Sequence, residues 1–202
     1  MTGRETARID TMRSIPVSRA ISEIETDMAG TATDRIAARL KLVDEHVRHE
    51  NDHNLEAIMG TFGATAHYDD EPWDAHYVGR DAVRTFYDGL LRALPGLRID
   101  VQHTHAGDLA IVLEVVIRGQ HLGPWRGLPA TGAQIELPLC GIFTFDSDER
   151  LAGERIYYDR ATLLRQLGVF HEPDRPMGRI TTLLTHPLTM AQIVLRKIWK
   201  RV

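Results

Sequence analysis

The hydrophobic period of the chain changes near residue 95, and this change constrains the fold more than any other feature. Before it, apolar residues recur at helical spacing, and Pro95-Gly96 ends the apolar helical face of 80–94. From Leu97 to Val101 apolar and polar residues alternate, which is the period of a half-buried strand. Helices followed by strands predict an α+β domain, with a curled antiparallel sheet and helices on one side.

The same patterns predict the individual elements and the division of the chain. Thr33 is expected to cap the first helix, after a hinge at 29–31. Helices are expected at about 33–47, 54–62, 80–94, 161–167 and 188–199, and strands at about 97–102, 109–117, 135–145 and 151–158, with an irregular strand-like stretch at 67–77. We expect an N-terminal arm (1–30), one domain (31–172) and a C-terminal tail with an amphipathic helix (173–202).

Composition excludes several classes of protein. The 202 residues, 43% hydrophobic and 26% charged, are typical of a soluble globular protein, and a net charge of −4 gives no reason to expect a nucleic-acid partner. The single cysteine, Cys140, excludes an internal disulfide framework. We see neither the apolar core of a signal peptide nor a run that could span a bilayer, so a cytoplasmic protein is expected.

The tail carries basic residues beside apolar ones, among them Arg196 and Lys197 beside Trp199. A basic amphipathic helix can bind a membrane surface, or it can dock on its own domain or across a dimer. We favour docking, and expect a homodimer without membrane contact.

One short motif suggests a metal site. His49-Glu50-Asn51-Asp52-His53 matches the H-E-x-x-H pattern of zinc proteases. Its neighbours are polar and it lies at a helix end, whereas zinc catalysis needs an apolar helix face around the ligands. We therefore interpret it as a solvated helix terminus and expect no metal.

A second constellation runs from Gly119 to Gly168. Four glycines shape a connection between two strands, and this connection carries His121 and Trp125. Asp159 follows the last strand and precedes a short helix, where a side chain can point into the mouth of a curved sheet.

This segment resembles the SnoaL-like polyketide cyclase (ester cyclase) group of the nuclear transport factor 2-like (NTF2-like) superfamily. The family pattern is G-x-H-x-G-x-x-x-G-x-P-x-T-G, then a strand, then an aromatic-Asp pair before L-L-x-Q-L-G. The matching residues are Gly119, His121, Gly123, Gly127, Pro129, Thr131, Gly132, Tyr158-Asp159 and Leu163 to Gly168. The helices fit the family order, so the resemblance covers about residues 33–170.

The resemblance implies a cone-shaped sheet that closes with its helices around an apolar pocket, often in a dimer. It also implies that Asp159 is the acid/base of an aldol-type closure and that no cofactor is used. A carboxylate in an apolar cavity has a raised pKa, which suits proton transfer beside a carbonyl. His121, Tyr68 or Tyr157 can donate a hydrogen bond to the enolate oxygen.

We therefore predict Asp159 and His121 as catalytic residues. The residues predicted to bind substrate are Tyr68, Trp125, Tyr157, Phe86 and His53. Simpler interpretations stay open: Asp159 can cap the following helix, His121 can bond to loop backbone, and the aromatic residues can be plain core.

Two functions follow. The first is an enzyme that moves protons at carbon on a hydrophobic, carbonyl-containing small molecule, as a cyclase, isomerase or dehydratase. An epoxide-opening variant would need an Asp beside an Arg-Asp partner, which Asp159-Arg160 alone does not supply. The second is a non-catalytic module that binds a lipophilic ligand or forms a dimer. A buried Asp159 facing the cavity favours the enzyme, and an Asp159 used for capping at the surface favours the binding module.

Overall fold

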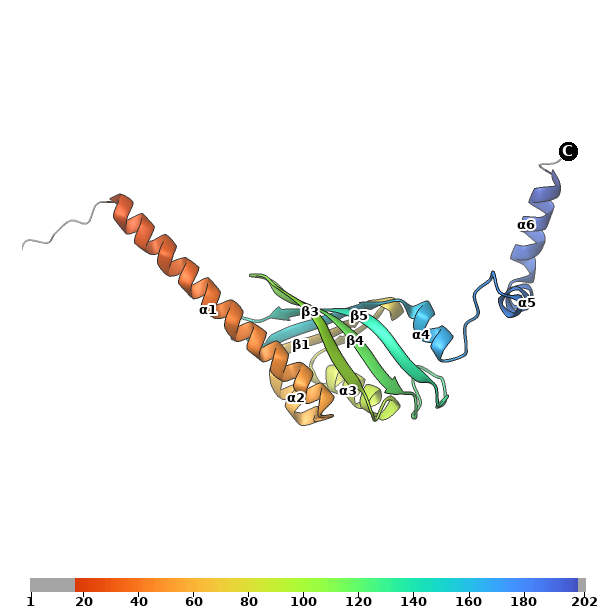
Figure 1. The fold of residues 1–202 in the computed structure, drawn as a ribbon, viewed down its shortest axis with the longest axis horizontal. Helices are drawn as coiled ribbons and strands as arrows, with labels where there is room; N and C mark the ends of the chain where they lie inside the picture. Colours follow the sequence, from red (N-terminus) through yellow and green to blue (C-terminus); the bar gives the residue numbers. More distant parts are fainter. Residues whose placement is uncertain (1–16, 200–202) are drawn as a thin grey trace, which may run out of the picture.

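The computed structural model describes residues 17–199, with side chains from Thr31 onward except at four positions of the last helix (Figure 1). The helices are α1 (Val17–Asn51), α2 (Leu55–Thr61), the single-turn η1 (Glu71–Trp73), α3 (Arg80–Ala93), α4 (Arg160–Gln166), α5 (Pro176–Thr185) and α6 (Pro187–Trp199). The strands are β1 (Phe62–Asp70), β2 (Ala75–Val78), β3 (Arg98–Ala106), β4 (Ala110–Gln120), β5 (Gln134–Phe145) and β6 (Leu151–Tyr158).

The six strands form one curved sheet in the order β2-β1-β6-β5-β4-β3. Every neighbouring pair is antiparallel except β1 and β6, which run parallel. Parallel pairing needs a long connection, and four strands and α3 separate these two along the chain. The predicted α+β architecture is confirmed.

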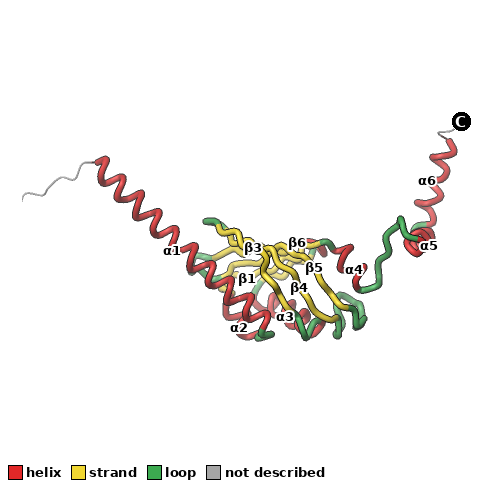
Figure 2. Tube along the Cα trace, in the orientation of Figure 1, coloured by secondary structure: helices red, strands yellow, loops and turns green. Residues whose placement is uncertain are grey.

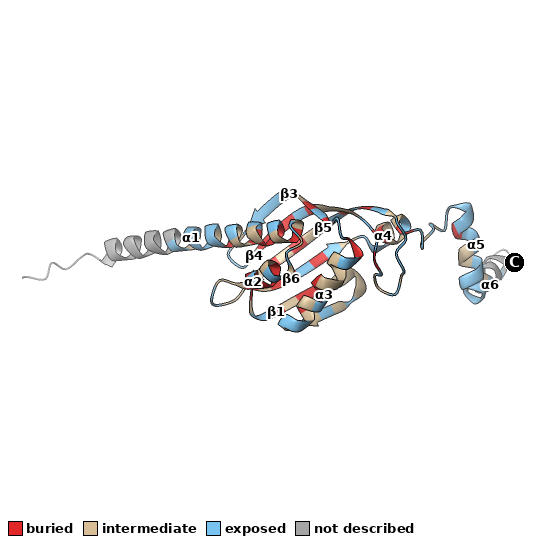
Figure 3. Ribbon diagram, turned by 90° about the horizontal axis from the view of Figure 1, so that it is seen from below, coloured by how far each residue is buried: buried red, intermediate tan, exposed pale blue. Residues whose placement is uncertain are grey.

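Helices cover one face of the sheet. The C-terminal half of α1, with α2 and α3, lies against that face, while the N-terminal half of α1 projects beyond it (Figures 1 and 2). Buried residues gather between the sheet and these helices (Figure 3). This core includes Val43, Ile58, Met59, Val83, Tyr87, Ile111 and Leu151. Burial of one helical face and one sheet face closes the domain.

Most predicted boundaries agree with the structure to within a few residues, and β6 has the predicted bounds. The hinge at 29–31 is wrong, because α1 is continuous through it and Thr33 lies inside the helix. The four alanines at 29, 32, 37 and 38 favour helix, whereas the single Gly30 costs only about 1 kcal/mol in a helix. Residues 1–16 of the predicted arm lie outside the described part.

The tail folds into two helices, of which the sequence predicted the second. α5 and α6 pack against each other and lie away from the sheet, beyond an extended segment (Figure 1). The tail therefore does not dock on its own domain, and docking across a dimer, the other form of the prediction, stays a prediction. Among the described residues, no helix is both long and apolar enough to cross a membrane.

Candidate functional site: an apolar cavity with a buried aspartate

A cavity lies between the sheet and α3, closed at one end by α4 and by the loop 121–133. Its wall is almost entirely apolar and aromatic, with a few polar groups. The lining residues are Tyr68, Asp70, Phe86, Leu90, Ala93, Leu94, Ile117, His121, Trp125, Ile135, Leu137, Leu139, Ile156, Tyr158, Leu163 and Leu167. An apolar pocket with few polar groups is the usual form of a small-molecule site.

Asp70 is the acidic group of this cavity. It ends β1 and is 1% exposed. One carboxylate oxygen, Oδ2, forms an ion pair with Arg126, and the other, Oδ1, has no hydrogen-bond partner among the described residues. Burial raises the pKa of Asp70, although Arg126 and the Tyr158 hydroxyl favour its charged form.

A tight turn brings Arg126 to Asp70. Trp125 and Leu128 exchange two backbone hydrogen bonds of 2.9 Å, and both residues between them have positive φ, +47° at Arg126 and +81° at Gly127. This is the two-residue hairpin turn that favours glycine at its second position. The Arg126 guanidinium lies over the ring of Trp73 at 4.8 Å and over that of Trp125 at 5.4 Å.

Tyr158 stands beside Asp70 at the end of β6. Trp73 Nε1 donates a hydrogen bond of 2.7 Å to the Tyr158 hydroxyl oxygen. The single hydroxyl proton of Tyr158 is therefore available to Asp70 or to a molecule in the cavity. Burial raises the pKa of Tyr158, so its hydroxyl stays protonated and can donate a hydrogen bond at neutral pH.

His121 supplies a second donor. It is 1% exposed, and the Thr131 hydroxyl lies 3.0 Å and the Thr131 backbone N–H 3.3 Å from its Nδ1. The backbone N–H can only donate, so Nδ1 is the acceptor and Nε2 carries the proton. Nε2 has no partner among the described residues. Burial lowers the pKa of His121, which keeps the ring neutral.

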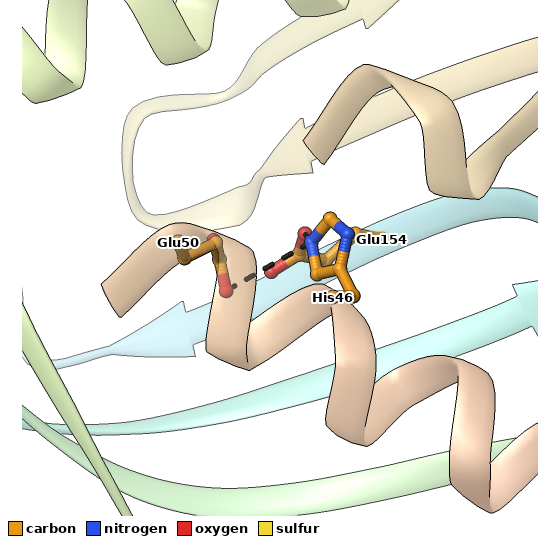
Figure 4. A group of neighbouring side chains, drawn as sticks. All are labelled: His46, Glu50 and Glu154. Atoms are coloured by element: carbon orange, nitrogen blue, oxygen red, sulfur yellow. Dashed lines mark ion pairs between the residues drawn. The ribbon is translucent and has the colours of Figure 1, made fainter. Parts of the chain in front are cut away.

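A second polar group lies deeper, around His46 of α1. Its Nε2 lies 3.0 Å from the Tyr87 hydroxyl, 3.4 Å from Glu154 and 3.8 Å from Glu50 (Figure 4). All four side chains are buried. Glu50 and Glu154 line a second, narrower cavity, which shares Tyr68, Leu90, Ile117, Leu139 and Ile156 with the first.

Burial and neighbouring charges shift the pKa values of this group. Burial works against a charged His46, but Glu50 and Glu154 outweigh it, so the pKa of His46 is raised. Burial raises the pKa of Glu50 to about 8, even though His46 favours its charged form. We interpret the group as a proton-sharing network around His46 and Glu50.

Comparison with known proteins places the chain in a family. The family model described as SnoaL-like polyketide cyclase matches residues 41–167, well over half of the chain. The chain belongs to the SnoaL-like polyketide cyclase family. No curated protein sequence matches it.

Solved structures show the same NTF2-like fold at low identity. A putative hydroxylase, AclR from Streptomyces galilaeus, is 23% identical over 67% of this chain and 99% of its own, with a TM-score of 0.59. A protein from Catenulispora acidiphila with a ketosteroid isomerase-like fold, solved with trimethylamine, is 16% identical over 64% and 93%, with a TM-score of 0.55. The epoxide hydrolase/cyclase-like enzyme SalBIII of salinomycin pyran-ring formation is 18% identical over 60% and 91%, with a TM-score of 0.53.

In this SnoaL-like chain, four of the predicted site residues line the cavity. They are His121, Tyr68, Phe86 and Trp125. Tyr68 stacks on Phe86 with ring centroids 3.9 Å apart, and Trp125 meets Phe86 edge to face at 5.9 Å. The structure thus brings these residues together, and their role in binding a substrate stays a prediction.

The predicted placement of Asp159 inside the cavity is wrong. Asp159 is exposed and is the N-cap of α4, where it accepts hydrogen bonds from the Ala161 N–H at 2.9 Å and the Thr162 hydroxyl at 2.5 Å. The Thr162 hydrogen bond, with those from the backbone, lowers the pKa of Asp159. Capping and solvent keep this carboxylate charged, which is the opposite of the environment that we predicted.

Two further predicted residues lie outside the cavity. Tyr157 is 44% exposed, because side chains alternate along β6 and its neighbour Tyr158 takes the inward position. His53 follows the end of α1, and its Nε2 lies 2.9 Å from the Leu97 carbonyl oxygen. His49 is still inside α1, so the two imidazoles of the H-E-x-x-H motif do not share a helix face.

Sequence reasoning missed Asp70, Tyr158 and Arg126. A signal for the first two was present: in a strand, residues two apart share a face. Tyr68 was predicted to line the pocket, so Asp70, two residues later, belongs on the same face of its strand. In the same way Ile156 is apolar and belongs on the inner face of its strand, which puts Tyr158 on that face too. Arg126 had only the weak signal of an Arg-Gly turn.

Proposed function

We propose that this SnoaL-like protein is an enzyme that moves a proton at carbon on a hydrophobic, carbonyl-containing small molecule, with Asp70 as the acid/base. One observation carries the proposal: Asp70 is buried in an apolar cavity with one carboxylate oxygen unpartnered. Its raised pKa lies closer to neutral pH than that of an exposed aspartate, which suits a group that accepts a proton from the substrate and returns it.

The other polar groups of the cavity support the same chemistry. Loss of a proton beside a carbonyl places negative charge on the carbonyl oxygen. His121 Nε2–H and the Tyr158 hydroxyl are donors at the cavity wall that can stabilise this oxygen. The pair with Arg126 holds Oδ2, which leaves Oδ1 as the oxygen that meets the substrate.

The test compares two aspartates of the same chain. Asp70→Asn should reduce exchange of the α-protons of a hydrophobic ketone such as decalone, followed by NMR in heavy water, by about 10²–10⁴-fold, the usual contribution of a general acid/base. Asp159→Asn, a surface cap, is the matched control and should exchange as the wild type does. Unchanged exchange in Asp70→Asn would overturn the role of Asp70, and loss in Asp159→Asn alone would restore the prediction from sequence.

Epoxide opening is a second candidate. The Asp70–Arg126 ion pair supplies the Arg-Asp part of that partnership inside the cavity. The likeness to SalBIII, described as epoxide hydrolase/cyclase-like, points the same way. Disappearance of a hydrophobic epoxide with the wild-type chain, and not with Asp70→Asn, together with no ketone exchange, would select this reaction.

A non-catalytic binding module remains the alternative from another class. The capping role of Asp159 at the surface by itself favours it, whereas Asp70 favours the enzyme. A wild-type chain that binds the ketone, seen as a shift of its NMR lines, and exchanges no proton would select the binding module. The homodimer, the absence of a nucleic-acid or membrane partner and the cytoplasmic location stay predictions.

A further inference from the structure

We propose that His46, Glu50 and Glu154 bind a divalent transition-metal ion, with zinc as the best fit and the Tyr87 hydroxyl as a fourth donor. This site shares Glu50 with the H-E-x-x-H motif but uses neither of its histidines. The imidazole comes from His46, one helical turn before Glu50, and the second carboxylate comes from β6 (Figure 4).

The spacing of the donor atoms fits one ion. The His46 ring nitrogen and one oxygen from each carboxylate all lie within 4.8 Å of one another. His46 Nε2 is 3.4 Å from Glu154 and 3.8 Å from Glu50. Ligands held at about 2.0–2.2 Å around a tetrahedral ion are about 3.3–3.6 Å apart. Small side-chain rotations would therefore complete the site.

The imidazole is already oriented as a metal ligand. The Thr61 hydroxyl donates to the Ile58 carbonyl at 2.6 Å, so it accepts from His46 Nδ1–H at 2.7 Å. This hydrogen bond at Nδ1 fixes the orientation of the ring and leaves Nε2 facing the carboxylates. Metal-binding histidines usually have such a partner on the other ring nitrogen.

Glu50 is the second buried carboxylate of the site. It is 5% exposed, and its carboxylate points at the cluster. The Tyr87 hydroxyl has one proton, which it donates to Glu154 at 2.5 Å. Glu50 Oε2 lies 3.8 Å from His46 Nε2, and the Tyr87 hydroxyl also favours the charged form of Glu50. With both carboxylates deprotonated and His46 neutral, as metal binding requires, one divalent cation would balance their two negative charges in place of the shared protons.

The chemistry of the donors selects the class of ion. One imidazole nitrogen with carboxylate oxygens in a tetrahedral arrangement suits Zn²⁺, and the excess of oxygen donors makes Mn²⁺ the nearest competitor. Glu50 and Glu154 also line the second cavity. The ion would join α1, α3 and β6 beneath the cavity.

The first experiment uses the full chain after dialysis against a chelator. Titration with Zn²⁺, and separately with Mn²⁺, is followed by calorimetry and by the Tm. We expect binding of one ion per chain, tighter for Zn²⁺, and a rise in Tm that saturates at one equivalent. A chain that binds neither ion stoichiometrically overturns the proposal and leaves a hydrogen-bonded network only.

Variants then place the ion. Glu50→Gln and Glu154→Gln should each weaken Zn²⁺ binding at least about tenfold, and Thr61→Val, which removes no ligand, should weaken it by about 10–100-fold. The matched control is Glu114→Gln, from the exposed pair in which His105 Nε2 lies 2.9 Å from Glu114, and it should bind as the wild type does. Loss of binding in this control alone, or full binding by Glu50→Gln, overturns the site. If a variant does not fold, the wild-type titration still decides.

Discussion

At the scale of single residues, the proposed chemistry rests on Asp70. Its carboxylate lies at the end of β1, between Arg126, which a tight turn holds in place, and Tyr158, whose hydroxyl oxygen accepts a hydrogen bond from Trp73. Each of these contacts favours the charged form, and burial opposes them with the larger effect. The protein therefore holds a carboxyl group that gives up its proton less readily than an exposed aspartate.

This raised pKa predicts a pH dependence of stability. The ordinary pKa of the side chain is 3.8, and the folded protein holds the proton to higher pH. Its contribution to stability is therefore present at low pH and is lost as the pH rises through the folded pKa. The free energy of unfolding of the wild type, measured by urea titration and compared with Asp70→Asn, should fall as the pH rises above about 4. A difference that rises over this range would contradict the assignment.

At the scale of elements, the loop 121–133 decides the shape of the cavity. Its start is fastened to the end of α3, where the N–H groups of Leu122 and Gly123 donate to the Ala93 carbonyl at 2.9 and 3.1 Å. The backbones of the loop and of α3 lie so close here that a Cβ on residue 123 would overlap the carbonyl group of Arg92. Only glycine fits, and the turn that carries Arg126 follows directly.

Replacement of two glycines by alanine should change the free energy of unfolding in opposite directions. Gly123→Ala should lower the free energy of unfolding by about 1–3 kcal/mol, because the loop must move off α3. Gly60→Ala, in α2 with open space around the added methyl group, should raise it by about 0.5–1 kcal/mol. Urea denaturation measures both. A neutral Gly123→Ala would show that the loop is not held against α3.

At the scale of the whole molecule, the chain consists of a packed domain with a helical extension at each end. α1 runs past the sheet on one side, and α5 and α6 lie beyond the other (Figure 1). Several large apolar side chains of these two tail helices are exposed, including Leu184, Leu188 and Trp199. Exposed apolar patches of this kind often mark an interface, and the homodimer stays a prediction.

Removal of the tail tests whether α5 and α6 are separate from the packed domain. A chain ending at Glu172 keeps α4 and every residue that lines the cavity. Its free energy of unfolding should stay within about 0.5 kcal/mol of that of the full chain, because surface changes away from the core have small effects. Sedimentation of both chains gives their oligomeric states. A large loss of stability would show that the tail is part of the domain.

The sequence by itself determined the class of fold and the order of its elements. Hydrophobic period is a local property, so the helical face before Pro95 and the alternation after Leu97 are readable without a structure. The same pattern placed the start of the second helix at Asn54, and the structure has Asn54 as its N-cap, with its side chain accepting from the Ala57 N–H at 3.1 Å. The glycine-rich loop and its His121 were likewise found from the motif.

Only the tertiary structure decided which carboxylate faces the cavity. Asp159 and Asp70 both end a strand, but a helix begins directly after Asp159 and uses its oxygens, whereas Asp70 meets Arg126, 56 residues away along the chain. A one-residue step in β6 likewise put Tyr158 inside and Tyr157 outside. The group of His46, Glu50, Tyr87 and Glu154 joins three elements. Contacts between distant segments depend on how the sheet and helices pack, and no local pattern records them.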